Sequence, residues 1–170
     1  NDKEVGQGLA TVCQSTGLQG RWQILGQAPL VVCDTGHNVA GWKYLSPQIR
    51  AQSYRTLRMV FGMVDDKDLD TVLTLLPKDA TYYFTQASTH RAVPCEVVAQ
   101  KAEKNALHGT IYNNVYAAYK AALSDAAKDD FVFVGGSSYV VADLLSNLKI
   151  CSENTKQGMP EKKAKSTSNP

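Results

Sequence analysis

Residues 30–41, LVVCDTGHNVAG, decide the predicted fold, because an apolar run ends there abruptly in small and polar residues. The run at 30–33 is too short for a buried helix and is typical of a central strand covered on both faces, and the glycine that follows allows a tight turn. Three polar side chains come directly after this strand: Asp34, His37 and Asn38. Ligands of open α/β sheets bind at the carboxyl ends of the strands, so we predict a site here.

Each of these three residues also has an ordinary structural interpretation. Asp34 or Asn38 would cap the next helix if its side chain accepted a hydrogen bond from an unpaired N–H, and His37 would then be a simple turn residue. An acid, an imidazole and an amide within five positions favour a site over three separate structural roles.

Strand and helix patterns alternate along the rest of the chain. The predicted strands are 20–25, 30–33, 55–62, 81–85, 109–112 and 130–134. The predicted helices are 3–15, 39–49, 69–76, 94–105, 115–127 and 140–148, and Pro47 should end or kink the second of them near Ser46. This alternation is typical of βαβ crossovers. We predict a three-layer, Rossmann-like α/β domain with a mostly parallel sheet and helices on both faces.

Composition excludes several classes of protein. The chain has 170 residues, the usual length of one domain, and its net charge of +2 comes from scattered basic residues, so we expect no nucleic-acid partner. No apolar stretch is long enough to cross a bilayer, and the polar start has no signal-peptide core, so we expect no membrane association. The tail at 151–170 is poor in apolar residues, and we expect it to be disordered.

The cysteines indicate the redox compartment of the protein, and the N-terminus indicates how the chain was produced. The four cysteines are widely spaced and form no C-x-x-C pair: Cys13, Cys33, Cys95 and Cys151. They are typical of reduced thiols in a cytoplasmic protein rather than of a disulfide framework or a zinc site, and we expect no metal site in this chain. The missing initiating Met indicates a processed protein or an excised domain.

Polar groups also follow three other predicted strands. Glycines and a helix start at 135–138 would form a seat for a carboxylate or phosphate, although a plain tight turn explains them equally well. The acidic run at 65–68 would hold magnesium or a substrate ammonium, but we favour a solvated helix start for Asp65 and Asp66 and leave Lys67 open. The loop at 86–94 carries Ser88, His90 and Arg91.

Three familiar catalytic motifs are missing. The chain contains no G-x-x-x-x-G-K-[ST], no G-x-G-x-x-G after its first strand and no G-x-S-x-G. Binding of a triphosphate by a P-loop, Rossmann dinucleotide binding and α/β-hydrolase chemistry therefore all lack their usual residues. The predicted site is partial.

Five segments carry a recognisable pattern in this order: GRW at 20–22, DTGHN at 34–38, VFGMVDDKD from 60, TQASTHRA from 85 and VGGSSY from 134. Together they resemble the C-terminal domain of the folylpolyglutamate synthase/dihydrofolate synthase family of the Mur ligase superfamily. The resemblance runs from about Gly8 to Leu145. The family's usual DGAHNP appears here as DTGHNV, with Val39 in place of proline, which loosens the turn and spares the functional positions.

The resemblance implies an activity and a role for each matched residue. The family makes an acyl phosphate from ATP and a folate or dihydropteroate carboxyl group, which the amine of L-glutamate then attacks. Arg21 would reach the nucleotide phosphates and Asp34 the ribose, which suits a guanidinium and a carboxylate. The implied nucleotide-binding residues are Arg21, Asp34, His37 and Asn38. The implied catalytic residues are His37 and Ser137, and the implied substrate-binding residues are Ser137, Arg91 and Lys67.

The family's P-loop and Mg²⁺ ligands belong to a preceding ATPase domain. We therefore expect residues 1–17 to be the last helix or linker of that domain, 18–150 to be the ligase domain, and this chain alone to be inactive. We expect the whole enzyme to be a cytoplasmic monomer. Three alternatives stay open: a cell-wall Mur ligase, which shares the Asp-x-x-His-Asn pattern, a non-catalytic ligand-binding module, and, least favoured, a phosphoacceptor signalling module, which needs an acidic pair after its first strand.

Overall fold

The structure, a computed structural model, describes residues 19–65 and 68–157. Its strands are β1 (Gln23–Gln27), β2 (Leu30–Asp34), β3 (Leu57–Phe61), β4 (Ala80–Phe84), β5 (Gly109–Ile111) and β6 (Phe131–Gly135). Its helices are α2 (Val39–Arg50), α3 (Leu69–Leu75), α4 (Cys95–Glu103), α5 (Val115–Asp125) and α6 (Ser138–Gln157). The predicted helix at 3–15 lies outside the described residues.

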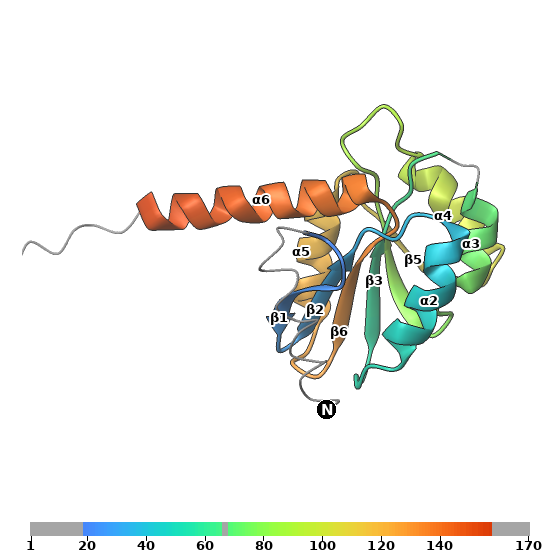
Figure 1. The fold of residues 1–170 in the computed structure, drawn as a ribbon, viewed down its shortest axis with the longest axis horizontal. Coiled ribbons are helices and arrows are strands. Elements are labelled where there is room, and N and C mark those ends of the chain that lie inside the picture. The colour runs from blue at the N-terminus through green and yellow to red at the C-terminus, as the bar shows by residue number, and fades with distance from the viewer. Residues whose placement is uncertain (1–18, 66–67, 158–170) are drawn as a thin grey trace, which may run out of the picture.

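All six strands form one sheet in the order β1-β2-β6-β3-β4-β5. β1 and β2 form an antiparallel hairpin in which Gln27 faces Leu30, and every other neighbouring pair is parallel. The chain crosses from β2 over the position of β6 to β3, continues outward to β5, and returns through α5 to place β6 in the centre (Figure 1). The predicted mostly parallel α/β sheet is confirmed.

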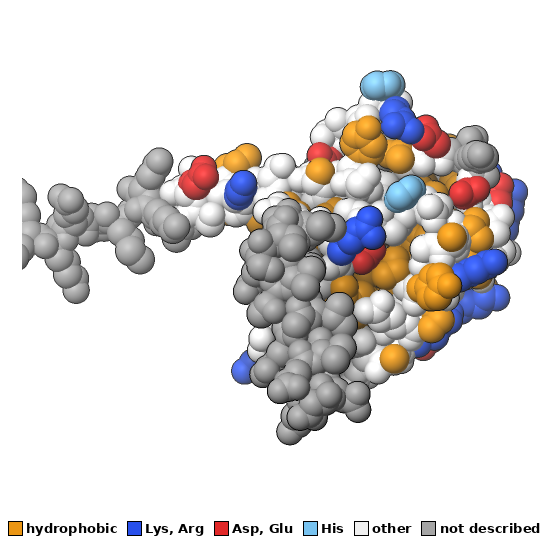
Figure 2. Space-filling model, viewed as in Figure 1, with side chains coloured by type: hydrophobic (Ala, Val, Ile, Leu, Met, Phe, Trp, Pro, Cys, Tyr) orange, Lys and Arg blue, Asp and Glu red, His pale blue; other side chains and the backbone are white. Residues whose placement is uncertain are grey.

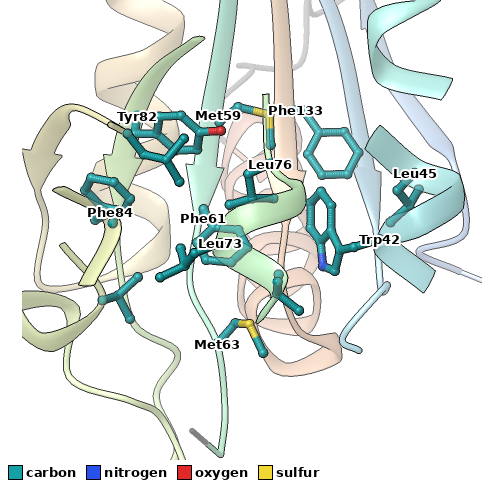
Figure 3. Packing of buried hydrophobic residues seen from close by; sticks show 14 of the residues in the cluster. Trp42, Leu45, Met59, Phe61, Met63, Leu73, Leu76, Tyr82, Phe84 and Phe133 are labelled. Atoms are coloured by element: carbon teal, nitrogen blue, oxygen red, sulfur yellow. The ribbon is translucent and has the colours of Figure 1, made fainter. Parts of the chain in front are cut away.

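Helices cover both faces of the sheet, because alternate strand residues point to opposite sides. α2, α3 and α4 pack on one face and α5 and α6 on the other (Figure 1). On the first face the buried Trp42 of α2 meets Phe61 and Phe133, with ring centroids 5.7 and 5.9 Å apart (Figure 3). These edge-on aromatic contacts fix α2 against the two central strands.

The carboxyl ends of the central strands meet at one edge of the sheet. Asp34 at the end of β2 lies beside Gly135 of β6, and Gly135 lies beside Phe61 of β3. The segments that follow these strands therefore emerge side by side. This confirms the expectation that the strands ending at Asp34 and Gly135 open onto the same edge.

Two helix boundaries differ from the prediction. Pro47 does not end α2, which continues to Arg50, because a proline removes only its own N–H and the Ala51 N–H still donates to the Pro47 carbonyl at 3.0 Å. α6 does not stop near Leu148 but runs to Gln157 (Figure 1), so the expected tail begins too early. Residues 158–170 lie outside the described residues.

One contact of the polar half of α6 involves α5. The Tyr116 hydroxyl of α5 lies 3.1 Å from the Cys151 sulfur at an exposed position, and α6 continues past the other elements of the domain (Figure 1). Composition alone cannot reveal such a tertiary contact.

Candidate functional site

A cleft of about 440 Å³ opens at the carboxyl edge of the sheet. It lies between the starts of α2 and α6 and the loops after β3 and β4. Its lining residues are His37, Asn38, Met63, Val64, Asp65, Asp68, Arg91, Ser138 and Tyr139.

Asp34 connects the turn before β1 to the end of β2 through hydrogen bonds, beside this cleft. Its Oδ2 accepts a hydrogen bond from the Trp22 N–H at 2.7 Å, and its Oδ1 accepts one from the Gly36 N–H at 2.8 Å. The turn before β1 is thereby fixed to the end of β2. Arg21 is exposed on that turn and lies at the carboxyl edge, although neither Arg21 nor Asp34 lines the cleft itself.

His37 and Asn38 line the cleft at the start of α2. The Asn38 Oδ1 accepts a hydrogen bond from the Gly41 N–H at 2.8 Å, which makes Asn38 the N-cap of the helix. His37 is exposed, and its Nδ1 lies 3.1 Å from the Thr35 carbonyl oxygen. The ordinary capping interpretation therefore holds for Asn38, while the His37 ring is open to a ligand.

Arg91 reaches the same cleft from the loop after β4. Its guanidinium pairs with Asp65, donates to the Tyr139 hydroxyl at 3.4 Å, and lies 5.8 Å from the centre of the Tyr139 ring. The hydrogen bond to Asp65, and then that to Tyr139, raises the pKa of Arg91 above its usual value, so the side chain is a permanent cation.

Asp65 is solvated, as predicted, but it does not start a helix. Asp65 lies before α3 in a left-handed conformation, with φ of 52°, and its N–H donates to the Arg91 carbonyl at 3.1 Å. Its carboxylate faces Arg91 rather than a helix N-terminus. The ion pair joins Asp65 and Arg91, which lie 26 residues apart on two different loops. The local sequence pattern around Asp65 therefore did not reveal it.

Ser137 lies beneath the cleft rather than in its lining. The residue is fully buried, and its Oγ accepts a hydrogen bond from the Val140 N–H at 3.1 Å, which caps the start of α6. The exposed neighbour Ser138 lines the cleft instead. The structure thus brings His37 and Ser137 to the same edge of the sheet but leaves only the His37 side chain facing the cleft.

Tyr139 and Asp143 are site residues that the sequence analysis missed. Tyr139 lines the cleft, and the Asp143 carboxylate accepts hydrogen bonds from both the N–H and the hydroxyl of Ser88, at 2.6 and 2.8 Å. Their spacing of one helical turn on α6 was the available signal, but it gains meaning only once the loop after β4 is seen to pack there. Lys67 lies outside the described residues.

The arrangement can bind an anion. The cleft combines the Arg91 cation, the His37 imidazole and the N-terminal ends of α2 and α6, whose dipoles favour negative charge. Within residues 19–65 and 68–157, no three His, Cys, Asp or Glu side chains gather in a way that could hold a metal ion. A carboxylate or a phosphate is the ligand that these groups suit.

Two further features concern the charge of the surface and the hydrophobicity of the helices. On the face shown in Figure 2, Lys and Arg side chains are interspersed with acidic ones. None of the helices in the described part of the chain is long and apolar enough to span a bilayer.

Comparison with known proteins gives a family match over most of the domain. The family described as Mur ligase, glutamate ligase domain, matches residues 20–138. That range contains the hairpin, the whole sheet and the start of α6.

Individual relatives show the same likeness. Dihydrofolate synthase/folylpolyglutamate synthase of Buchnera aphidicola is 29% identical over 131 residues, which are 76% of this chain and 31% of that protein. The structure of Escherichia coli FolC in complex with DHPP and ADP has a TM-score of 0.73 and 27% identity, covering 79% of this chain and 32% of that chain. The Yersinia pestis bifunctional folylpolyglutamate synthase/dihydrofolate synthase, complexed with AMPPNP and a Mn ion, has a TM-score of 0.70 and 26% identity, covering 80% and 32%. This chain therefore spans about a third of the length of each of these three relatives.

Proposed function

Because the chain belongs to the Mur ligase family through its glutamate ligase domain, we propose that it is the C-terminal domain of an ATP-dependent ligase that adds glutamate to a folate or to dihydropteroate. The observation that carries the proposal is the cleft, where Arg91, His37 and two helix N-termini converge at the carboxyl edge of the sheet. Such a cleft suits the carboxylates and phosphates that an acid–amino-acid ligase must hold. The domain would form one wall of an interdomain active site.

Arg21 and Asp34 would meet the nucleotide. The exposed guanidinium of Arg21 would offset charge on the transferred phosphoryl group. Asp34 would accept from the ribose hydroxyls: each of its carboxylate oxygens takes one backbone hydrogen bond and keeps further capacity to accept. Asn38 would contribute mainly by ordering the start of α2 beside the nucleotide.

His37 and Arg91 would meet the incoming glutamate. Arg91 would pair with a glutamate carboxylate, and the exposed His37 ring would contact the glutamate or the transferred phosphate. The Ser137 hydroxyl keeps its own proton to donate while it accepts from Val140, and in this proposal it supports the end of the cleft from below. We retain Lys67 as a substrate-binding candidate on the strength of the resemblance alone.

The remaining parts of the catalytic site would come from a preceding ATPase domain. We propose that this domain carries the P-loop and the Mg²⁺ ligands, and the lack of a P-loop motif in this sequence supports that division. The described residues include no group of three His, Cys, Asp or Glu side chains that could hold a metal ion, and the Asp65 carboxylate at the cleft is paired with Arg91. We therefore derive no step through a metal from this domain.

The relatives support the folate branch over a cell-wall Mur ligase. The relatives and solved structures described above are folylpolyglutamate or dihydrofolate synthases, and two of those structures were obtained with ADP or AMPPNP. We also propose that the enzyme is a cytoplasmic monomer. The buried thiols of Cys33 and Cys95, neither of which forms a disulfide, support a reducing compartment.

The test is an assay of ADP release by the full-length protein, with its ATPase domain, and by this chain alone. We expect the full-length protein to release ADP only when glutamate is present together with dihydropteroate or a reduced folate. We expect this chain alone to release none. Folate-dependent ADP release by the isolated chain would contradict the split site, and dependence on a nucleotide-linked muropeptide would favour the cell-wall branch.

A further inference from the structure

Two residues on α6, Tyr139 and Asp143, contact the same loop after β4. They lie four residues apart, so their side chains project from one face of the helix. The loop they contact carries Arg91, the cation of the cleft. Neither residue belongs to the roles proposed above for nucleotide or glutamate.

Asp143 forms hydrogen bonds with the first part of the loop. Both of its carboxylate oxygens are used: Oδ2 accepts from the Ser88 N–H at 2.6 Å and Oδ1 accepts from the Ser88 hydroxyl at 2.8 Å. Hydrogen bonds to an ionised acceptor are shorter and stronger than those between neutral groups. The two hydrogen bonds to Asp143 therefore restrain the loop although they are exposed to solvent. The loop is thereby fixed three residues before Arg91.

Tyr139 supports the guanidinium itself. The Arg91 carbon Cζ lies 5.8 Å from the centre of the Tyr139 ring, within the range of a cation–π contact, and Arg91 Nη1 donates to the Tyr139 hydroxyl at 3.4 Å. Asp65 pairs with the same guanidinium. Arg91 is therefore held between an aromatic ring on α6 and a carboxylate on the loop after β3.

We propose that Tyr139 and Asp143 are positioning residues that hold Arg91 ready over the cleft, an inference that rests on the proposed function for its substrate, glutamate. A surface arginine loses much side-chain freedom when it binds a carboxylate, and an arginine already held in place loses less. The helix whose N-terminus lines the cleft would thus also set the geometry of the cation that completes it. In this proposal the two residues act on the substrate through Arg91.

The first test uses this chain and needs no substrate. Amide hydrogen exchange at Ser88 and the Arg91 Nε–H resonance are measured in Asp143→Ala, Asp143→Asn, Tyr139→Ala and Tyr139→Phe. We expect Asp143→Ala to speed exchange at Ser88 by about tenfold or more, and Asp143→Asn, which keeps one acceptor oxygen, to have a smaller effect. Tyr139→Ala should shift the Arg91 resonance, while Tyr139→Phe should keep most of the wild-type position because the ring remains.

Matched controls come from residues outside this contact. Glu153→Gln removes a carboxylate from the far end of α6, and Tyr44→Ala removes a tyrosine that is 80% exposed on α2. Both should leave the Ser88 and Arg91 signals unchanged. An unchanged Ser88 exchange rate in Asp143→Ala, or an unchanged Arg91 resonance in Tyr139→Ala, would overturn the positioning role whether or not the ligase activity exists.

The second test separates positioning from general structural damage in the full-length enzyme. With either alanine variant, we expect the KM for glutamate to rise by about tenfold and the KM for ATP to stay within about twofold, with recovery in Tyr139→Phe. An equal rise in both KM values, or no recovery in Tyr139→Phe, would contradict the proposal. A full-length wild-type enzyme without ligase activity would refute the proposed function while the exchange measurements still decide the positioning role.

Discussion

The Trp22 N–H donates a hydrogen bond of 2.7 Å to the Asp34 carboxylate, which joins the start of the hairpin to the end of its second strand. The same carboxylate accepts from the Gly36 N–H at 2.8 Å, so it also shapes the turn that leads to His37. Asp34 therefore has a structural role in addition to any contact with a nucleotide. Arg21 is exposed and directly precedes Trp22, so this hydrogen bond lies next to Arg21 in the chain.

The first prediction separates Asp34 from Arg21. Asp34→Ala leaves two backbone N–H groups without their acceptor, so we expect the free energy of unfolding to fall by about 2 kcal/mol, together with a large loss of turnover in the full-length enzyme. Arg21→Ala should also reduce turnover strongly but change the free energy of unfolding by less than about 1 kcal/mol. Urea unfolding of this chain and kinetics of the full-length enzyme measure the two effects. Equal stability of the two variants would contradict the structural role of Asp34.

The second prediction concerns a buried charge network at the opposite edge of the sheet. The Asp130 side chain is fully buried, pairs with Arg58 at 3.1 Å and accepts from the Ala127 N–H at 3.0 Å. Breaking a buried pair leaves an unpaired charge, so Asp130→Asn should lower the free energy of unfolding by about 3 kcal/mol. Asp129→Asn is the matched control, since its carboxylate is 67% exposed and should contribute less than about 1 kcal/mol. Similar unfolding midpoints for the two variants would refute the network's importance.

The third prediction is a pH dependence that follows from the same carboxyl group. Burial opposes ionisation of Asp130, but the Ala127 N–H, followed by Arg58 and Arg55, outweighs it and lowers the pKa below its usual value. The stabilisation is therefore fully present above the unfolded-state pKa of about 3.9 and is lost as the pH falls through the lower folded-state pKa. Urea unfolding of the wild type from about pH 6 to about pH 2 should show this loss, which begins near the unfolded-state pKa and continues below it. Asp130→Asn should show a correspondingly flatter pH profile.

The sequence predicted the order of strands and helices because burial on both faces of a parallel sheet leaves short apolar runs separated by helical patterns. It also predicted which strand ends meet, since connection through helices brings the ends of β2 and β6 to one edge. It did not predict the side-chain contacts between segments that lie far apart in the sequence. The pairs Asp143–Ser88 and Asp130–Arg58 join residues 55 and 72 positions apart, and no local pattern encodes such distances.

The strand ends that carry the proposed site residues were predicted more accurately than the contacts of their side chains. Proximity along the sheet edge placed His37 and Ser137 together correctly, but whether a side chain faces a cleft depends on local backbone geometry. Ser137 precedes α6 in the position where a hydroxyl caps the helix, so its side chain turns toward the Val140 N–H. Asn38 was open to either interpretation and caps α2.

The fourth prediction contrasts Ser137 with His37. Ser137→Ala removes the cap of a 20-residue helix and should lower the free energy of unfolding by about 1 kcal/mol, whereas His37→Ala, at an exposed position, should change it by less than about 0.5 kcal/mol. In the full-length enzyme, His37→Ala should raise the KM for glutamate or lower turnover while the ATP affinity stays intact. A selective fall in ATP affinity would instead assign His37 to the nucleotide.

The last prediction tests the turn that joins β6 to α6. Gly136 has a φ of 105°, a backbone conformation that residues other than glycine rarely adopt. An added Cβ would also collide with the Gly62 carbonyl oxygen and lie 2.9 Å from the Phe61 ring. Backbone cannot yield as a flexible side chain does, so Gly136→Ala should lower the free energy of unfolding by more than about 2 kcal/mol. Gly41→Ala is the matched control: Gly41 lies in α2, where a Cβ would meet its nearest neighbours at 3.4 and 3.7 Å, and alanine should stabilise the helix by about 0.5 kcal/mol or more. Thermal unfolding of the two variants measures the contrast, and a Gly136→Ala variant as stable as the wild type would show that the turn tolerates a side chain.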